Sequence, residues 1–287
     1  MKSRDTRLQP DCRQTAHSTL SEMQQMATIP FYAEQNTECT LFEHAWKKQL
    51  PLLIKGPTGC GKTRFVEHMA ARLKRPLITV SCHDDLSASD LVGRFLIGNG
   101  NTIWSDGPLA RAVRQGAICY LDEVVEARKD TTVVLHPLAD DRRILPIERT
   151  GEELIAPPEF MLVISYNPGY QNLLKGLKPS TRQRFLALSM TYPKPEVELT
   201  IIQSETGIST ACATQLVHLA KAFRSLTEFD LEETVSTRLL VSAGRLVASG
   251  LALRVACQAA IIDALTDDES TAEALGEVVL AMVGDAP

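Results

Sequence analysis

Short apolar runs alternate with helix-like segments between residues 50 and 190. The runs are LPLLIKG, PLITVSC, GAICYLDEV, FMLVISYNP and RFLALSM. They have strand length and are rich in Ile, Leu and Val, which is typical of parallel strands buried on both faces. The intervening segments have a helical period, as in TRFVEHMAARL, where the apolar positions are Phe65, Val66, Met69, Ala70 and Leu73. This alternation predicts an α/β domain of three layers around a parallel sheet.

The pattern changes at YPKPEV, where two prolines mark a boundary. Beyond it, the segments EVELTIIQSET, TACATQLVHLAKAFRSL, STRLLVSAGRLVAS and ALRVACQAAIIDAL all have a helical period. One apolar face of the second segment is formed by Ala213, Leu216, Val217, Ala220 and Phe223. We therefore expect a polar N-terminal arm at 1–28, the α/β domain at 29–192 and a small all-helical domain at 193–287.

Two segments of the α/β domain are predicted to be inserted hairpins, at 95–108 and 142–160. In FLIGNGNTIWSDGPL, apolar arms flank Gly-Asn-Gly-Asn, and in RRILPIERTGEELIAPPEF they flank ERTGEE. The alternative is that both are plain surface loops. An exposed arm bearing Trp104 is expected to meet a neighbouring subunit, a partner or a substrate. The competing interpretation is that Trp104 packs under its own hairpin.

Composition narrows the possible functions only slightly. With 44% hydrophobic and 23% charged residues, the 287-residue chain is typical of a globular protein. Its net charge of −5 argues against a broad nucleic-acid-binding surface. The seven cysteines are scattered without a C-x-x-C pair, which fits a reducing compartment. The N-terminus lacks an apolar signal, and the apolar stretch near 246–265 is interrupted by charges, so we expect a cytoplasmic protein that spans no membrane.

The clearest chemical motif is IKGPTGCGKTRF, which contains the phosphate-loop pattern G-x-x-x-x-G-K-[ST]. A strand-like run precedes it and a helical segment follows it, as such a loop requires. Its predicted nucleotide-binding residues are Gly56, Pro57, Thr58, Gly59, Cys60, Gly61, Lys62 and Thr63. The loop amides and the helix N-terminus face an anion, Lys62 reaches the β- and γ-phosphates, and the Thr63 hydroxyl binds Mg²⁺.

Two further strand ends carry polar residues suited to a nucleotide. AICYLDEV ends in Asp122 and Glu123, the Walker B arrangement. Asp122 is expected to hold Mg²⁺ through water, and Glu123 to act as general base on the attacking water. In FMLVISYNP, Asn167 follows the next strand, where it is either a contact to the γ-phosphate or catalytic water, or a turn former before proline.

Arginines supply the remaining candidates. Arg182 and Arg184 in LKPSTRQRF precede an apolar run, either as cations that complete a neighbouring subunit's site or as solvated surface groups. Arg238 begins a helix of the C-terminal region, from which it can fold back over the nucleotide. Arg245, on the same helix, is the alternative candidate for this contact, but we expect its role to be structural.

Taken together, these motifs resemble an AAA+ ATPase of the MoxR branch, with the two hairpins matching its helix-2 and pre-sensor-1 insertions. More narrowly, GPTGCGKTRFVEHMA and SYNPGYQNLLKGLKPSTRQRF are similar to the CbbQ/NorQ subfamily over about residues 30–285. The resemblance implies ATP and Mg²⁺ as cofactors and a homo-hexamer with nucleotides between subunits. It implies that Asn167 is sensor 1, that Arg184 is the arginine finger with Arg182 as a second trans contact, and that Arg238 is sensor 2. MoxR relatives often have proline before that arginine, whereas Thr237 precedes it here.

The resemblance is strongest to CbbQ-like proteins. It implies a motor that works with a CbbO-like partner containing a von Willebrand factor A domain to reactivate inhibited Rubisco. The alternative within the family is a NorQ-type role in the maturation of nitric oxide reductase. A kinase and a purely regulatory nucleotide-binding module are alternatives from other classes, although Glu123 favours turnover. The catalytic residues would be the same whether the protein acts on Rubisco or on nitric oxide reductase, so sequence motifs alone do not separate these two roles.

Overall fold

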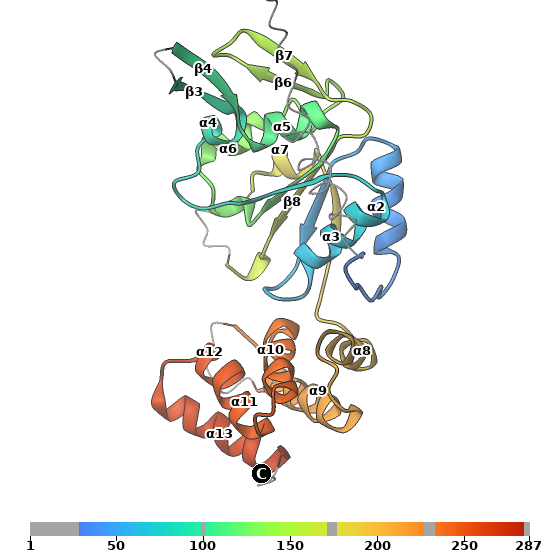
Figure 1. The fold of residues 1–287 in the computed structure, drawn as a ribbon, viewed down its shortest axis with the longest axis vertical. Coiled ribbons are helices and arrows are strands. Elements are labelled where there is room, and N and C mark those ends of the chain that lie inside the picture. The colour runs from blue at the N-terminus through green and yellow to red at the C-terminus, as the bar shows by residue number, and fades with distance from the viewer. Residues whose placement is uncertain (1–28, 99–100, 171–176, 227–232, 284–287) are drawn as a thin grey trace, which may run out of the picture.

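A five-stranded parallel sheet forms the centre of the first domain in the computed structural model, which describes residues 29–98, 101–170, 177–226 and 233–283 (Figure 1). The sheet contains β1 (Leu52–Lys55), β2 (Leu77–Ser81), β5 (Ile118–Asp122), β8 (Met161–Tyr166) and β9 (Leu186–Ser189). Their order is β2-β5-β8-β1-β9, and every neighbouring pair is parallel. The five apolar runs of the sequence are these five strands, so the predicted α/β class is confirmed.

Helices cover both faces of this sheet. Helices α2 (Glu38–Lys47) and α3 (Lys62–Arg72) share one apolar cluster with Leu52 and Ile54 of β1, while Leu53 packs in a second cluster with α4 (Ala88–Val92) and α5 (Pro108–Gln115). This alternation follows from the two-residue period of a strand. Strands β1, β5 and β8 are almost wholly buried, but β2 and β9 are partly exposed. Burial on both faces therefore holds for the inner strands only, because an edge strand has a neighbour on one side alone.

The C-terminal region is entirely helical within its described residues. It contains α8 (Pro195–Thr206), α9 (Thr210–Ser225), α10 (Thr237–Ala248), α11 (Leu253–Cys257), a π-helical turn η3 (Gln258–Ile262), α12 (Asp263–Leu265) and α13 (Glu269–Val283). These helices enclose a separate apolar core, which includes all five residues of the apolar face predicted for α9. No helix in the described ranges is long and apolar enough to cross a bilayer.

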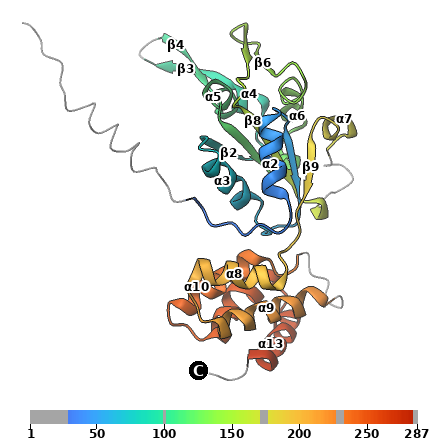
Figure 2. The same ribbon diagram turned by 90° about the vertical axis from the view of Figure 1, so that its right-hand side faces the viewer.

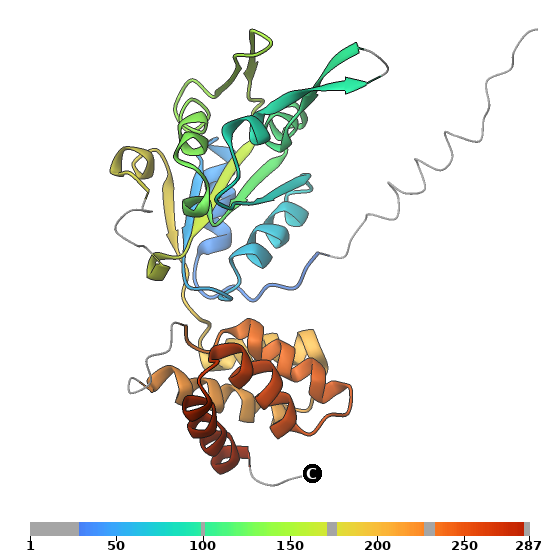
Figure 3. The ribbon, with the colours of Figure 1, turned by 90° about the vertical axis from the view of Figure 1, so that its left-hand side faces the viewer.

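Two antiparallel hairpins project from the end of the α/β domain that lies away from the helical region (Figures 1, 2 and 3). They pair β3 (Gly93–Gly98) with β4 (Asn101–Asp106), and β6 (Ile144–Ile147) with β7 (Glu152–Ile155). Trp104 contacts Phe95 edge-to-face, with ring centroids 5.1 Å apart, and packs partly against the α/β core. Trp104 thus packs locally, whereas Ile97 of the same hairpin is 88% exposed.

Arg114 on α5 connects both hairpins to the α/β domain. Its Nε donates a hydrogen bond to Asp106 of β4 at 2.6 Å, and its two terminal nitrogens bind Glu152 of β7 at 2.8 and 2.6 Å. The other Asp106 oxygen accepts a bond from the Trp104 indole at 2.7 Å. The planar guanidinium can hold two carboxylates at once, so one side chain binds the base of the first hairpin at Asp106 and the turn end of the second at Glu152.

We expect Arg114→Met to loosen both hairpins and to leave the sheet unchanged. Backbone amides of β4 and β7 should exchange with solvent faster, while those of β5 and β8 keep their protection. Hydrogen bonding to Arg114 lowers the pKa of Glu152, so the contribution is present at neutral pH and is lost as pH falls through that lowered pKa. Arg111→Met, at an exposed position of the same helix, is the control. Equal exchange in both variants would show that Arg114 does not hold the hairpins.

Candidate functional site

A cavity of about 770 Å³ lies between the phosphate-loop edge of the α/β domain and the helical region. The phosphate loop, Asp122 and Glu123 form part of its lining, and Phe31, Tyr32, Ala33 and Gln35 form another part. Residues of α8 and α10, including Arg238 and Arg245, line it from the helical region. The volume lies within the range of small-molecule sites, and both domains contribute walls.

The phosphate loop joins β1 to α3 and depends on its glycines. Gly59 and Gly61 have φ angles of 69° and 101°, a backbone conformation that side chains disfavour. A Cβ atom at Gly59 would lie 2.5 Å from the Cβ of Ser236, so a larger residue would not fit there. Gly61 is the N-cap of α3, which directs the N-terminus of this helix and its free amides into the cavity.

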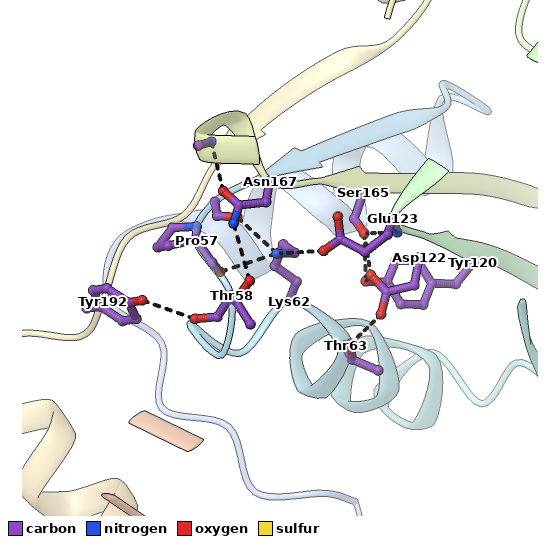
Figure 4. A network of polar contacts seen from close by, with 12 residues as sticks. Pro57, Thr58, Lys62, Thr63, Tyr120, Asp122, Glu123, Ser165, Asn167 and Tyr192 are labelled. Atoms are coloured by element: carbon purple, nitrogen blue, oxygen red, sulfur yellow. Dashed lines mark hydrogen bonds and ion pairs between the residues drawn. The ribbon is translucent and has the colours of Figure 1, made fainter. Parts of the chain in front are cut away.

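Lys62 is the first helical residue of α3, and its side chain is almost buried at 6% exposure. Its ammonium donates hydrogen bonds to the carbonyl oxygens of Gly56 at 2.9 Å and Pro57 at 3.2 Å (Figure 4). It also lies 3.5 Å from a carboxylate oxygen of Glu123. The structure therefore brings the lysine of the loop and the second Walker B acid together at one point.

Asp122, at the end of β5, is held by a network that the sequence motifs did not reveal. One of its carboxylate oxygens accepts bonds from the hydroxyls of Tyr120 at 2.8 Å and Ser165 at 2.6 Å. The other accepts a bond from the Thr63 hydroxyl at 3.1 Å. Ser165 also accepts a bond from the Glu123 amide at 3.3 Å. A polar serine inside the apolar run FMLVISYNP was the one available signal of this role.

The paired oxygens of Thr63 and Asp122 fit a magnesium ion. Mg²⁺ prefers oxygen ligands and usually combines one or two protein groups with water and substrate phosphates. No group of three or more His, Cys, Asp or Glu side chains in the described residues forms a metal cage. A hydroxyl and a carboxylate beside a phosphate loop therefore match a cation that arrives with a nucleotide.

Asn167, only 7% exposed, lies directly after β8 and above the loop. Its amide nitrogen donates to the Thr58 hydroxyl at 3.2 Å, and its oxygen accepts a bond from the Gly169 amide at 3.0 Å. The second bond belongs to the short 3-10 turn η2 (Pro168–Tyr170). Asn167 thus serves as a turn former and contacts the phosphate loop, while its contact to the γ-phosphate or the catalytic water stays a prediction.

Arg182 and Arg184 do not line the cavity of their own chain. Arg182 ends the short helix α7 (Pro179–Arg182) and is exposed, and Arg184 precedes β9. His136 shares a 2.9 Å hydrogen bond with Thr181 of this helix. Burial and then the nearby charge of Arg184 lower the pKa of His136. The structure therefore separates both arginines from the phosphate loop, as a contribution to another subunit's site requires.

Arg238 and Arg245 both face the cavity from α10. Arg245 binds Glu205 of α8 at 3.2 Å, and Glu205 also binds Arg64 of α3 at 3.3 Å. Arg245 is thereby engaged in a bridge between the domains. Arg238 lies closer to the loop, since its Cβ is 3.3 Å from the position that a Gly59 side chain would occupy.

Cys60, inside the loop, is 4% exposed and belongs to the apolar cluster beneath α2 and α3. Burial raises the pKa of its thiol, which therefore stays protonated and packs as a small apolar group. Its contribution to an anion site is restricted to the backbone.

Comparisons with known proteins agree with this geometry. Residues 51–185 match the family model described as AAA domain (dynein-related subfamily), and residues 198–282 match the CbbQ/NirQ/NorQ C-terminal family. A mutant of Thermotoga maritima RuvB has a similar fold, with a TM-score of 0.52 at 17% identity over 85% of this chain and 71% of that one. At that identity the similarity concerns the fold alone.

Curated relatives are much more similar in sequence. The denitrification regulatory protein NirQ of Stutzerimonas stutzeri is 61% identical over 255 residues, covering 89% of this chain and 93% of the relative. NorQ of Paracoccus denitrificans is also 61% identical, over 89% of this chain and 94% of its own. CbbQ of Hydrogenophilus thermoluteolus is 54% identical, over 86% and 92%. The protein therefore belongs to the CbbQ/NirQ/NorQ family of AAA+ ATPases.

Proposed function

We propose that this protein is a Mg²⁺-dependent ATP hydrolase whose site is completed by a neighbouring subunit of a homo-hexamer. The observation that carries the proposal is the convergence of Lys62, the Thr63–Asp122 pair and Glu123 on one wall of the cavity. A regulatory nucleotide-binding module needs the loop but has no use for a carboxylate beside it. A kinase would need a site for the phosphate acceptor and would not need arginines from another subunit.

Each residue of this wall has a role that follows from its position. The loop amides and the α3 N-terminus bind the phosphates, and Lys62 adds a positive charge beside them. Mg²⁺, bound by Thr63 and Asp122, would neutralise phosphate charge. Glu123 orients and deprotonates the attacking water, and Asn167 holds the loop through Thr58. Tyr120 and Ser165 fix the Asp122 carboxylate and thereby keep one oxygen directed at Thr63.

The client of the motor is proposed from the relatives. The overall resemblance of the sequence favoured a CbbQ-type role, but identities of 60–61% to two NirQ proteins and one NorQ protein, against 54% to one CbbQ protein, favour a role in denitrification instead. We infer a NorQ-type function, in which the ATPase and a partner containing a von Willebrand factor A domain mature or activate nitric oxide reductase. The second candidate is the CbbQ-type role, reactivation of inhibited Rubisco with a CbbO-like partner. The CbbQ relative, which matches over 86% of this chain, supports it.

Glu123→Gln should retain nucleotide binding and lower the rate of ATP hydrolysis by roughly 10²–10⁴-fold, because the general base is lost and the loop is intact. Lys62→Ala should instead weaken nucleotide binding itself. The measurements are steady-state hydrolysis and equilibrium binding of a fluorescent ATP analogue. Glu153→Gln, an exposed position on the distant hairpin, is the matched control. Turnover near the wild-type rate in Glu123→Gln would disprove the assignment of the base.

Arg184→Ala should lower hydrolysis by about a thousandfold in the assembled ring without preventing assembly, because a trans arginine stabilises transition-state charge. Mixing Arg184→Ala subunits with Lys62→Ala subunits should restore part of the activity. In some mixed interfaces an intact loop then faces an intact arginine. Arg182→Ala, assayed in parallel, should have the smaller effect. If the Arg184→Ala ring hydrolyses ATP normally, Arg184 is only a surface cation.

The two client roles are separated by one paired assay. The protein, ATP and the matching von Willebrand factor A partner are incubated either with immature nitric oxide reductase or with Rubisco blocked by a tight-binding sugar phosphate. We expect recovery of nitric oxide reduction and no recovery of carboxylation, in both cases relative to Glu123→Gln. Recovery of carboxylation alone would replace the denitrification role with the Rubisco role.

A further inference from the structure

The helix that carries Arg238 begins directly against the phosphate loop. Ser236 caps α10 by accepting a bond from the Leu239 amide at 3.4 Å. A side-chain carbon at Gly59 would lie 2.5 Å from the Cβ of Ser236, so the helix start and the loop are in close contact. The direction in which Arg238 points therefore depends on how the first turn of α10 is held.

A buried carboxylate holds that first turn. Glu198 on α8 is 1% exposed and accepts a 2.6 Å hydrogen bond from the hydroxyl of Thr237. Arg224 on α9 donates to both Glu198 oxygens, at 2.8 Å each. A carboxylate this deeply buried requires such hydrogen bonding, and the two-pronged geometry fixes its orientation. Because Thr237 is the residue before Arg238, Glu198 fixes the backbone from which Arg238 extends.

Arg224 also connects the helical region to the phosphate loop, through Tyr192. Arg224 donates to the Val235 carbonyl at 2.8 Å and lies 4.4 Å above the ring centre of Tyr192. The Tyr192 hydroxyl donates to the Thr58 carbonyl at 3.1 Å (Figure 4). Burial is the main cause that raises the pKa of Tyr192 to about 12, so this hydroxyl stays protonated and donates at neutral pH. The side chains of Glu198, Arg224, Thr237 and Tyr192, called here the Glu198 cluster, thus connect α8, α9 and α10 to the phosphate loop.

We propose that Glu198, Arg224 and Thr237 of this cluster position Arg238 toward the terminal phosphate of the nucleotide and thereby set the preference for ATP over ADP, while Tyr192 connects them to the phosphate loop. Thr237 supplies the hydroxyl that binds Glu198 directly before Arg238 in the chain. Residues of the cluster act through Arg238 and Thr58 and are positioning residues. The inference rests on the proposed nucleotide function of the cavity.

The test compares Thr237→Val, which keeps the side-chain shape and lacks the hydroxyl, with Thr237→Ser, which keeps the hydroxyl. Fluorescent analogues of ATP and ADP report equilibrium binding to the full-length assembled protein, and kcat and KM for ATP are measured on the same preparations. In Thr237→Val the ATP-over-ADP preference should fall about five- to tenfold, because one charge-assisted contact to phosphate is misplaced. Thr237→Ser should keep the wild-type preference.

A double-mutant cycle with Arg238→Ala distinguishes positioning from general destabilisation. If Thr237 acts through Arg238, Thr237→Val should cause no further loss of preference once Arg238 is alanine. The proposal would be overturned if the two substitutions lowered the ATP-over-ADP preference independently, so that their effects multiplied in the double variant. It would also be overturned if Thr237→Val lowered the melting temperature and left the ATP-over-ADP preference unchanged. Tyr192→Phe is a second variant, since it keeps the ring beneath Arg224 and removes only the bond to Thr58. It should weaken binding of both nucleotides to a similar extent.

The readouts separate this inference from the proposed function. A wild-type protein that binds both analogues and does not hydrolyse ATP would refute the hydrolase, while the binding preference of Thr237→Val would still decide the role of the cluster. A wild-type protein that binds neither analogue would refute both. Hydrolysis by the wild type together with an unchanged preference in Thr237→Val would refute the positioning role alone.

Discussion

The fixed position of the phosphate loop is the constraint on which the rest of the site depends. The Lys62 ammonium holds the loop carbonyls from inside, Asn167 binds Thr58 from the sheet, and Tyr192 binds the same residue from the interdomain segment. Gly59 lies against Ser236 without room for a side chain. A loop held from three directions presents its amides in one arrangement, so little reorganisation is required when an anion binds. The same contacts make the loop sensitive to any shift of the helical domain.

The parallel sheet explains why residues far apart in sequence meet at this loop. The carboxyl ends of β1, β5 and β8 lie at one edge, since these strands are adjacent and parallel. Asp122 follows β5 and Asn167 follows β8, so both are delivered beside the loop that follows β1. In open α/β sheets this edge is the usual ligand site. The order of the strands therefore brings Asp122 and Asn167 to the phosphate loop, although the three motifs are far apart along the chain.

Much of this arrangement was predictable from sequence. The five strands, the helical C-terminal region and both hairpins followed from periodicity, because an apolar pattern reports which face of an element is buried. Helix α2 was not predicted, although its buried apolar residues Cys39, Phe42 and Ala45 recur at helical spacing. The Glu198 cluster was not predictable either. It joins residues separated by 26 and 39 positions, and a glutamate within a helical pattern looks like an ordinary exposed residue until the packing is known. The burial of the edge strands β2 and β9 was overestimated for a similar reason, because the local sequence pattern does not reveal which strands lie at the edges of the sheet.

The molecule is polarised, with the nucleotide cavity at one end of the sheet and the two hairpins at the other (Figures 1 and 3). A client or partner that contacts the hairpin tips therefore does not touch the nucleotide of the same subunit. Coupling between them has to pass through packed elements, and α5 is placed for this task. Its apolar face lies in the core beside β5, the strand that carries Asp122, while its Arg114 binds the base of one hairpin and the turn end of the other. A displacement of β5 would thus reach both hairpins through one rigid helix, and their exposed apolar residues Ile97 and Ile155 would move together.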